Sequence, residues 1–460
     1  MFDKELGRFQ YPHEYSKPAV IAKFPGDAHL EQIKQLENPA FTDIDYAEKM
    51  QRFVNFKKSK GNYFVDTDGN TVLDLNAAQA GLVLGYNNDD LVNARMGTEL
   101  YDRFVTHKVD ASSLPSHDLA DLVREMVMPN APEGMVQVHL GGGSTGAEAN
   151  ELAISAALTK FAKAKGTSVS GLSVLGFDNS NHGQTTATLS CSGPDANPEG
   201  LPAFPWPKGD YPQLKYPLAK FQHENIAEED RCLEGVKKSI AGGNVGAMIV
   251  EPISSIGNQM ATPYFYRELQ KIAKAGGIPF IVDETKTGMG ASGKNWAHEY
   301  WYLKEAPDYM TFGGKAGISG FYSTYDFRMN DEATSFSQNI NMIKLLNYGT
   351  IWNVLKKGDI LGLDLLHHQK ATSSFLKIEL DRVGAEKGLI SNVRGYGTHL
   401  GFDFANEKTA QSVQRWLFKS GVHALLCGPK TLALRPSMTL GVKEGAVLRD
   451  SLYHFHPNHE

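Results

Sequence analysis

The sequence contains few cysteines, no long apolar run and no excess of basic residues. Its three cysteines, Cys191, Cys232 and Cys427, lie far apart and none belongs to a Cys-x-x-Cys pair. The cysteines therefore indicate neither a disulfide framework nor a zinc or iron–sulfur site. They indicate a protein of a reducing compartment. No apolar stretch approaches the roughly 18 residues that a membrane-spanning helix needs, so we expect no insertion into a membrane.

The distribution of charge limits the classes of molecule that the protein is expected to bind. The net charge is −6, and no basic run or basic–aromatic alternation is present. Nucleic acid is therefore not an expected partner. The opening "MFDKELGRFQ" has neither an apolar signal core nor the character of a transit peptide. The histidines of "HFHPNHE" at the other end are not expected to be metal ligands.

The length of 460 residues and an apolar content of 41% suit a globular protein of two or three domains. We expect an N-terminal arm over residues 1–57 and the first part of a small domain over 58–95. A large domain is expected over 96–338, and the rest of the small domain over 339–460. The chain shows no internal repeat and no low-complexity linker.

Between residues 135 and 320 predicted strands and helices alternate. Strands are expected at "MVQVHL", "LSVLGF", "VGAMIV" and "IPFIVDE", and helices at "AEANELAISAALTKFAKA" and "YFYRELQKIAKAGG". Such alternation is typical of βαβ units around a mostly parallel sheet. The parts of the sequence assigned to the small domain predict an α+β fold, with a hairpin around Asp68-Gly69 and one strand at "VRGYGTHLGFDF". The fold class is therefore α/β.

Two glycine-rich stretches raise alternatives. "GGGSTG", with Gly141, Gly143 and Gly146, fits the dinucleotide pattern, but the acidic residue expected about 20 positions later is missing. What remains is either a phosphate cup at a helix N-terminus or a tight strand-to-helix turn. "GGKAG", with Lys315, is not a nucleotide-binding loop, because Ala316 stands where a magnesium-binding hydroxyl is required.

Asp283 ends the apolar strand "IPFIVD", at the carboxyl edge of the predicted sheet. A carboxylate there needs a cation or hydrogen-bond donors, and a helix cap or a structural ion pair would also supply them. A phosphate cup, an aspartate at a strand end and Lys315 further along suggest pyridoxal phosphate. The aspartate would keep the pyridine nitrogen protonated, and the lysine would form the Schiff base.

Motifs along nearly the whole chain carry a resemblance. They are "SKGNYFVDTDGNTVLDL", "GYNNDDL", "TGAEANE", "FPWP", "YPLAKF", "EEDRCLE", "IVEPI", "FIVDE", "GKNWAHEYW", "NVRGYGT" and "LRPSMTL". With them the chain resembles the class III, fold type I pyridoxal-phosphate aminotransferases, most closely the 4-aminobutyrate group. The resemblance implies a homodimer with the cofactor at the subunit interface, and the mitochondrial matrix as the usual location of eukaryotic members.

Several positions match the site of that family. The resemblance implies that they belong to the cofactor site or the substrate site. They are Gly146, Ala147 and Asn150 in the phosphate cup, Asp283 at the pyridine nitrogen, Ser335 toward the phosphate across the dimer, Glu251 of "EPI", and Arg435 of "RP" as the carboxylate-binding arginine.

Two family motifs are altered. Where 4-aminobutyrate aminotransferases carry their Schiff-base lysine this chain has Gly314, and only the following Lys315 remains. In an extended chain that shift moves the attachment point by about 3.3 Å and turns the side chain to the opposite face, unless the glycines allow a rearrangement. The Cys-x-x-Cys pair of animal members is replaced by Thr145 and Glu148, so no iron–sulfur cluster is expected.

Four further positions depart from the resemblance. Asn181 replaces the aromatic residue that stacks on the pyridoxal ring, and Gln184 replaces the arginine that clamps the 4-aminobutyrate carboxylate. Ile256 replaces the glutamate that pairs with the second arginine, and Lys286 replaces a glutamine near the pyridoxal oxygen. Losing a charge-assisted clamp of this kind weakens binding by roughly a hundredfold.

Two hypotheses follow. The first is a catalytically degenerate member, kept for its dimeric shape as a structural or assembly component of a larger complex, with at most residual cofactor binding. The alternative is an active pyridoxal-phosphate aminotransferase of 4-aminobutyrate type or altered specificity. It would use Lys315, or less favourably Lys286, with Asp283 at the ring and Arg435 at the substrate carboxylate.

Overall fold

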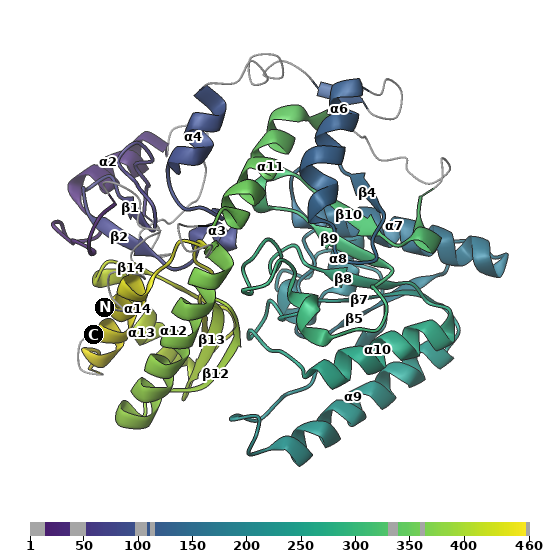
Figure 1. Ribbon diagram of the computed structural model, residues 1–460. Coiled ribbons are helices and arrows are strands. Elements are labelled where there is room, and N and C mark those ends of the chain that lie inside the picture. The colour runs from purple at the N-terminus through teal and green to yellow at the C-terminus, as the bar shows by residue number, and fades with distance from the viewer. Residues whose placement is uncertain are drawn as a thin grey trace. The chain divides into compact units, whose positions relative to one another are not determined.

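A computed structural model describes residues 14–36, 52–96, 108–110, 116–329, 339–358 and 364–456. The chain forms two compact units (Figure 1). The larger unit is residues 94–355, and the smaller unit combines residues 1–93 with 356–460. We propose that the expected division into arm, large domain and two-part small domain describes parts that fold together.

The larger unit is built on a seven-stranded sheet. Its strand order is β4-β10-β9-β8-β7-β5-β6, and β9 through β6 run parallel, whereas β10 runs antiparallel to both β9 and β4. The strands are β4 (Gln137–Leu140), β5 (Ser173–Phe177), β6 (Lys208–Gly209), β7 (Val245–Val250), β8 (Phe280–Asp283), β9 (Tyr309–Phe312) and β10 (Gly320–Ser323). The α/β class with a mostly parallel sheet is confirmed.

Helices cover both faces of this sheet (Figure 1). Val174 of β5 packs in a core cluster with residues of α7 (Gly146–Lys165). Phe177, three positions later on β5, contacts Phe265 of α10 (Pro263–Gly276), with ring centroids 6.2 Å apart. Residues an odd number apart in a strand point to opposite faces, so α7 and α10 lie on opposite sides of the sheet.

The remaining elements of the larger unit are shorter or peripheral. They are β3 (Lys108–Asp110), paired with β11 (Asn339–Asn341), and the helices α6 (His117–Leu122), α8 (Thr186–Cys191), α9 (Gln222–Ala241), which packs beside α10, and α11 (Met342–Lys356). In the part of the chain that the structure describes, no helix has the length and apolar character needed to cross a membrane.

The smaller unit holds two sheets. One has the order β1-β2-β14, with β1 (Tyr63–Val65), β2 (Thr71–Asp74) and β14 (Val422–His423), and the other has the order β12-β13-β16-β15, with β12 (Ile390–Tyr396), β13 (His399–Phe404), β16 (Thr431–Ala433) and β15 (Leu425–Leu426). Its helices are α2 (Asp27–Leu36), α3 (Ala77–Ala80), α4 (Asp89–Met96), α12 (Leu365–Lys387), α13 (Glu407–Lys419) and α14 (Val442–Tyr453).

Two sequence predictions about this unit can be compared with the structure. The hairpin around Asp68-Gly69 is confirmed, because β1 and β2 pair antiparallel across that turn. The single strand predicted at "VRGYGTHLGFDF" is wrong, because β12 and β13 form an antiparallel hairpin there. The chain reverses at Gly397, whose φ of +57° belongs to the left-handed region that glycine adopts without a steric penalty.

Candidate functional site

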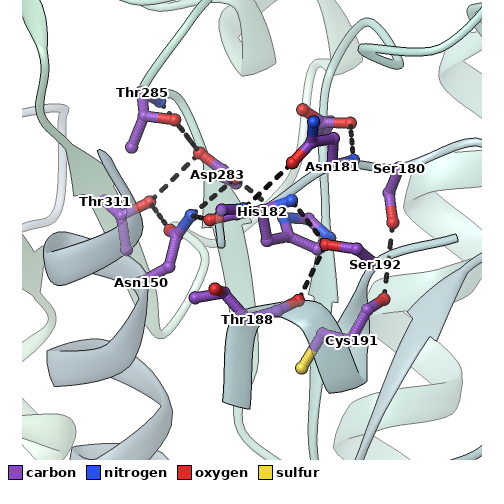
Figure 2. Close-up of polar contacts among 12 residues, drawn as sticks. Asn150, Ser180, Asn181, His182, Thr188, Cys191, Ser192, Asp283, Thr285 and Thr311 are labelled. Carbon is purple, nitrogen blue, oxygen red and sulfur yellow. Dashed lines mark hydrogen bonds and ion pairs between the residues drawn. The ribbon is translucent and has the colours of Figure 1, made fainter. Parts of the chain in front are cut away.

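Asp283 lies at the centre of a buried hydrogen-bond cluster (Figure 2). It is the last residue of β8, and only 2% of it is exposed. Its Oδ2 accepts from His182 Nδ1 at 2.7 Å and from Asn150 Nδ2 at 2.8 Å. Its Oδ1 accepts from the hydroxyl and the amide of Thr285 at 2.6 and 3.0 Å. Thr311 Oγ1 donates to Asn150 Oδ1 at 2.7 Å and thereby fixes that amide.

This cluster sets the protonation state of Asp283. Burial raises the pKa of a carboxyl group, but the hydrogen bond and charge of His182, the charge of Lys286 and the Thr285 hydroxyl outweigh it and hold the pKa of Asp283 below its usual value. Asp283 is therefore an ionised carboxylate in an apolar sheet edge. His182 Nε2 is buried and has no hydrogen-bond partner among the described residues.

The glycine-rich turn joins β4 to α7. Thr145 caps α7, because its hydroxyl accepts from the amide of Glu148 at 3.2 Å. The Glu148 carboxylate accepts from the amide of Gly143 at 2.6 Å. The amides of Gly146 and Ala147, in the first turn of a 20-residue helix, have no acceptor in the part of the chain that the structure describes. Within the "GGGSTG" turn and the start of α7, these two amides are therefore the donors that suit an anion.

The loop after β9 carries Lys315. Gly314 has φ +76° and ψ −45°, and residues 315–317 form one turn of 3-10 helix. The chain is therefore not extended here, and the side-chain alternation assumed from the sequence does not apply. The Lys315 side chain turns inward, with 4% of the residue exposed, and its Nζ donates to the carbonyl of Gly288 at 2.7 Å. The side chain thus ends at the segment that follows Asp283.

Gly314 faces the helix that bears the free amides. Its own amide donates to the carbonyl of Ser144 at 2.9 Å, so the lysine loop and the glycine-rich turn are joined. A Cβ placed on Gly314 would have no atom closer than the Gly146 amide nitrogen, at 4.0 Å. The backbone therefore leaves open space beside the N-terminus of α7.

Lys286 belongs to a second polar cluster. Its Nζ donates to the Asn181 carbonyl and to Ser255 Oγ, both at 2.5 Å, and lies 3.2 Å from Glu251 Oε1. Glu251 Oε2 accepts from the amides of Asn181 and Ser255 at 3.1 and 2.9 Å. Lys286 therefore forms an ion pair with the glutamate of "EPI".

The other positions singled out from the sequence are dispersed. Gln184 is exposed, and its Nε2 donates to the Ala196 carbonyl at 3.1 Å. Ile256 is partly buried. Arg435 lies in the smaller unit, where it is buried. Ser335 lies outside the described residues. Asn150, expected in the phosphate cup, donates instead to the aspartate at the end of β8.

The residues present fit a ligand that has a phosphate and a ring nitrogen. The free amides of Gly146 and Ala147 suit the phosphate. The ionised carboxylate of Asp283 suits a protonated ring nitrogen. The loop at Gly314 leaves open space beside these amides. The same loop carries Lys315, whose buried amine reaches the segment after Asp283. This combination fits pyridoxal phosphate.

Sequence reasoning missed the residues that hold Asp283 in place. His182, Thr285 and Thr311 were not identified as parts of the site, although Thr285 directly follows the motif "FIVDE". A signal was available for His182, because it comes shortly after the predicted strand "LSVLGF", where a side chain can reach the carboxyl edge of the sheet. Nothing in the sequence pairs Ser255 with Lys286, since that contact depends on how two loops meet.

Comparison with known proteins gives a consistent result. The family model described as aminotransferase class III matches residues 45–454. A 4-aminobutyrate aminotransferase from Dictyostelium discoideum is 34% identical, over 93% of this chain and 89% of that protein. The mitochondrial 4-aminobutyrate aminotransferase of Sus scrofa is 32% identical, over 92% and 88%.

A solved structure supports the fold. The lysine aminotransferase from M. tuberculosis in its internal aldimine form has a TM-score of 0.78 and 22% identity, covering 92% of this chain and 97% of that one. At this identity the likeness shows a shared fold. Together with the family match over most of the sequence, it establishes that the chain belongs to the class III aminotransferase family.

Proposed function

We propose that this protein is a pyridoxal-phosphate-dependent aminotransferase related to the 4-aminobutyrate aminotransferases, with Lys315 as the residue that attaches the cofactor. The supporting observation is the conformation of Gly314. Its positive φ turns the chain so that the next side chain enters the buried segment after Asp283. In this proposal the backbone at Gly314 offsets the displacement of the lysine by one position.

Each residue has a role in this proposal. Bound pyridoxal phosphate withdraws electrons from the substrate carbon that loses a proton. Asp283, held ionised by His182, keeps the ring nitrogen protonated and thereby strengthens that withdrawal. The amides of Gly146 and Ala147 hold the phosphate. The freed amine of Lys315 carries the proton to and from the substrate carbon.

Covalent labelling tests the attachment. The purified protein is mixed with pyridoxal phosphate, reduced with borohydride and digested, and the modified lysine is found by mass spectrometry. We expect the label at Lys315 and its loss in Lys315→Ala. Lys344→Ala is the matched control and should keep the label. Lys344 belongs to α11 and lies beside the lysine loop, since a Cβ placed on Gly317 would lie 3.5 Å from its side chain. A label at Lys286 in the unaltered protein would contradict the proposal.

A second candidate is a catalytically degenerate member retained as a structural or assembly component. It is favoured by glycine at the position of the family's lysine and by Asn181, Gln184 and Ile256 at altered substrate and ring positions. Absence of any labelled lysine, together with absence of visible absorbance after addition of pyridoxal phosphate, would favour this candidate. Copurification with a large assembly would support it further.

Assembly and location are proposed from the relatives. We propose a homodimer in which Ser335 reaches the phosphate across the interface and Arg435 binds a substrate carboxylate. A mitochondrial location is proposed because several of the relatives are named mitochondrial. Size-exclusion chromatography with light scattering tests the dimer, and a Ser335→Ala change that weakens cofactor retention would support the role of that hydroxyl.

A further inference from the structure

We propose that the larger unit has a second ligand site, beside α9 and α10, which binds a carboxylate joined to an apolar ring. The site is a cavity of about 630 Å³. Residues of both helices and of two loops line it, among them Leu218, Ile226, Pro263, Tyr264, Arg267 and Tyr302. None of its lining residues belongs to the Asp283 cluster or to the lysine loop, so this proposal is independent of the aminotransferase function.

The size and the walls of this cavity suit a small organic ligand. Ligand cavities in proteins span about 300–1,000 Å³ and are lined mainly by apolar and aromatic side chains, with few polar groups. Leu218 precedes α9, Ile226 lies near the start of that helix, and both are exposed apolar side chains. Pro263 begins α10. An apolar ring held against these side chains would remove apolar surface from water, which stabilises the bound state.

Two tyrosines add aromatic surface to the same cavity. The Tyr264 hydroxyl donates to Asp230 Oδ1 at 2.7 Å, which holds that side chain in place. Tyr302 is 67% exposed and has a φ of +52°, a backbone conformation that costs energy for a residue with a Cβ. Strained residues of this kind are concentrated at ligand sites. Since aromatic rings favour stacked or edge-to-face contacts with one another, these two side chains suit a ligand that carries a ring.

Arg267 gives the cavity its charge. It is the only charged residue among those that line the cavity in the described part of the chain. Its Nη1 donates to the Trp301 carbonyl at 3.2 Å, and its other N–H groups have no partner within the described ranges. A guanidinium has five N–H donors in a planar fork that matches a carboxylate. The cavity therefore offers donors for one carboxylate beside an apolar surface.

Two acidic residues near the cavity already have partners. Glu229 is buried and accepts from the amide and the hydroxyl of Thr262 at 2.6 and 2.8 Å, and burial raises its pKa. Asp230 accepts from Tyr264. Neither acidic side chain is among those that line the cavity. An anion that binds to Arg267 therefore meets no carboxylate in the cavity wall that would repel it.

Two compounds that differ in one group test the site. The first is 4-benzoylbenzoate, which has two aromatic rings and a carboxylate, and the second is 4-benzoylbenzamide, in which a neutral amide replaces the carboxylate. The variants are Arg267→Gln, Arg267→Lys and Ile226→Ser. Arg328→Gln is the matched control, because Arg328 also donates to a backbone carbonyl, that of Tyr325, and does not line the cavity.

Isothermal titration calorimetry of the purified chain measures the affinities, and thermal unfolding checks that each variant is folded. We expect the acid to bind at least about tenfold more tightly than the amide. Arg267→Gln should weaken binding of the acid by about ten- to a hundredfold and abolish the preference, whereas Arg267→Lys should retain part of it. Ile226→Ser should weaken binding of both compounds by about fivefold, and Arg328→Gln should change neither affinity.

Photochemical labelling locates the bound compound. Irradiation attaches the benzophenone to a nearby C–H bond, and mass spectrometry of the digested protein identifies the labelled peptide. We expect the label within residues 218–226 or 262–267, or at Tyr302. A label on the lysine loop or next to Asp283 would place the compound in the proposed aminotransferase site and overturn the second site.

Three affinity results would also overturn the proposal. The first is binding of neither compound, and the second is binding of the acid that Arg267→Gln leaves unchanged. The third is equal affinity for the acid and the amide, because an apolar surface without a charge preference suits an uncharged partner and not a carboxylate.

Discussion

Two buried aspartates, one in each compact unit, have similar hydrogen-bonding surroundings but differ in whether those surroundings leave room for a ligand. Asp403 lies on β13 of the smaller unit and accepts from Arg394 Nη2 at 2.8 Å, Thr431 Oγ1 at 2.7 Å and Asn392 Nδ2 at 3.0 Å. Burial raises the pKa of Asp403, and the hydrogen bond and charge of Arg394 outweigh it and lower the pKa below the usual value. Asp283 has the same direction of shift.

The difference lies in the partners. The partners of Asp403 come from the two strands that pair with β13, which are β16 and β12. One of them, Arg394 on β12, carries a permanently charged guanidinium. Those of Asp283 come from a helix, a loop and an imidazole that still has one buried nitrogen without a described partner. The first arrangement is closed and stabilises the sheet. The second leaves room for another hydrogen-bonding group, as a ligand site requires.

The largest expected effect is on the closed arrangement. Arg394→Met leaves the Asp403 carboxylate buried without a cation, so we expect the free energy of unfolding to fall by about 3–5 kcal/mol. Urea denaturation followed by circular dichroism measures this. Arg382→Met removes an arginine that is 52% exposed and is the control, with a change of no more than about 1 kcal/mol. A loss of similar size in both variants would show that Asp403 is not closed as described.

The next effect distinguishes the two carboxylates by ligand binding. Asp283→Asn removes the charge that a protonated ring nitrogen needs, so the Kd for pyridoxal phosphate should rise by roughly ten- to a hundredfold. Asp403→Asn should lower stability but leave that Kd unchanged in the protein that remains folded. Fluorescence titration with pyridoxal phosphate checks both. Equal weakening in the two variants would remove the distinction between structural and ligand-binding aspartate.

The sequence predicted one of these arrangements and not the other. Asp283 stood out because it ends an apolar strand at the carboxyl edge of a parallel sheet, a place defined by topology. Asp403 did not, because the sequence was interpreted as one strand and the hairpin turn at Gly397 was missed. Apart from Thr285, the partners of both aspartates lie between 9 and 133 positions away in the sequence, and spacing alone does not predict such pairings.

The lysine loop illustrates the same limit. The sequence located Lys315 one position from where the family carries its lysine, and it raised the question of whether glycine could compensate. The answer depends on the backbone, because φ at Gly314 decides which way the next side chain turns. Glycine permits both signs of φ, so the sequence allowed the positive φ at Gly314 without predicting it.

A third aspartate tests the rule that donors keep a buried carboxylate ionised. Asp308 accepts one hydrogen bond, from the Phe280 amide at 2.8 Å, and burial raises its pKa to about 6 despite that bond. The folded state then binds a proton that the unfolded state has released, so stability falls as the pH rises from about 4 to about 6. Asp308→Asn should therefore raise the free energy of unfolding at pH 7 by about 2 kcal/mol. Denaturation at pH 4 and pH 7 measures the change, and a gain that is larger at pH 4 would contradict this assignment.

The smallest effect comes from the two hydroxyls. Thr431→Val and Thr285→Val each remove one donor, at 2.7 and 2.6 Å from Asp403 and Asp283, while the other donors remain, so each should lower stability by about 1 kcal/mol. The two should differ once pyridoxal phosphate is added. A ring nitrogen can replace the lost donor at Asp283, so the ligand should reduce the deficit of Thr285→Val and leave that of Thr431→Val unchanged. Thermal unfolding with and without the ligand measures this, and an unchanged deficit in both variants would place the ring nitrogen away from Asp283.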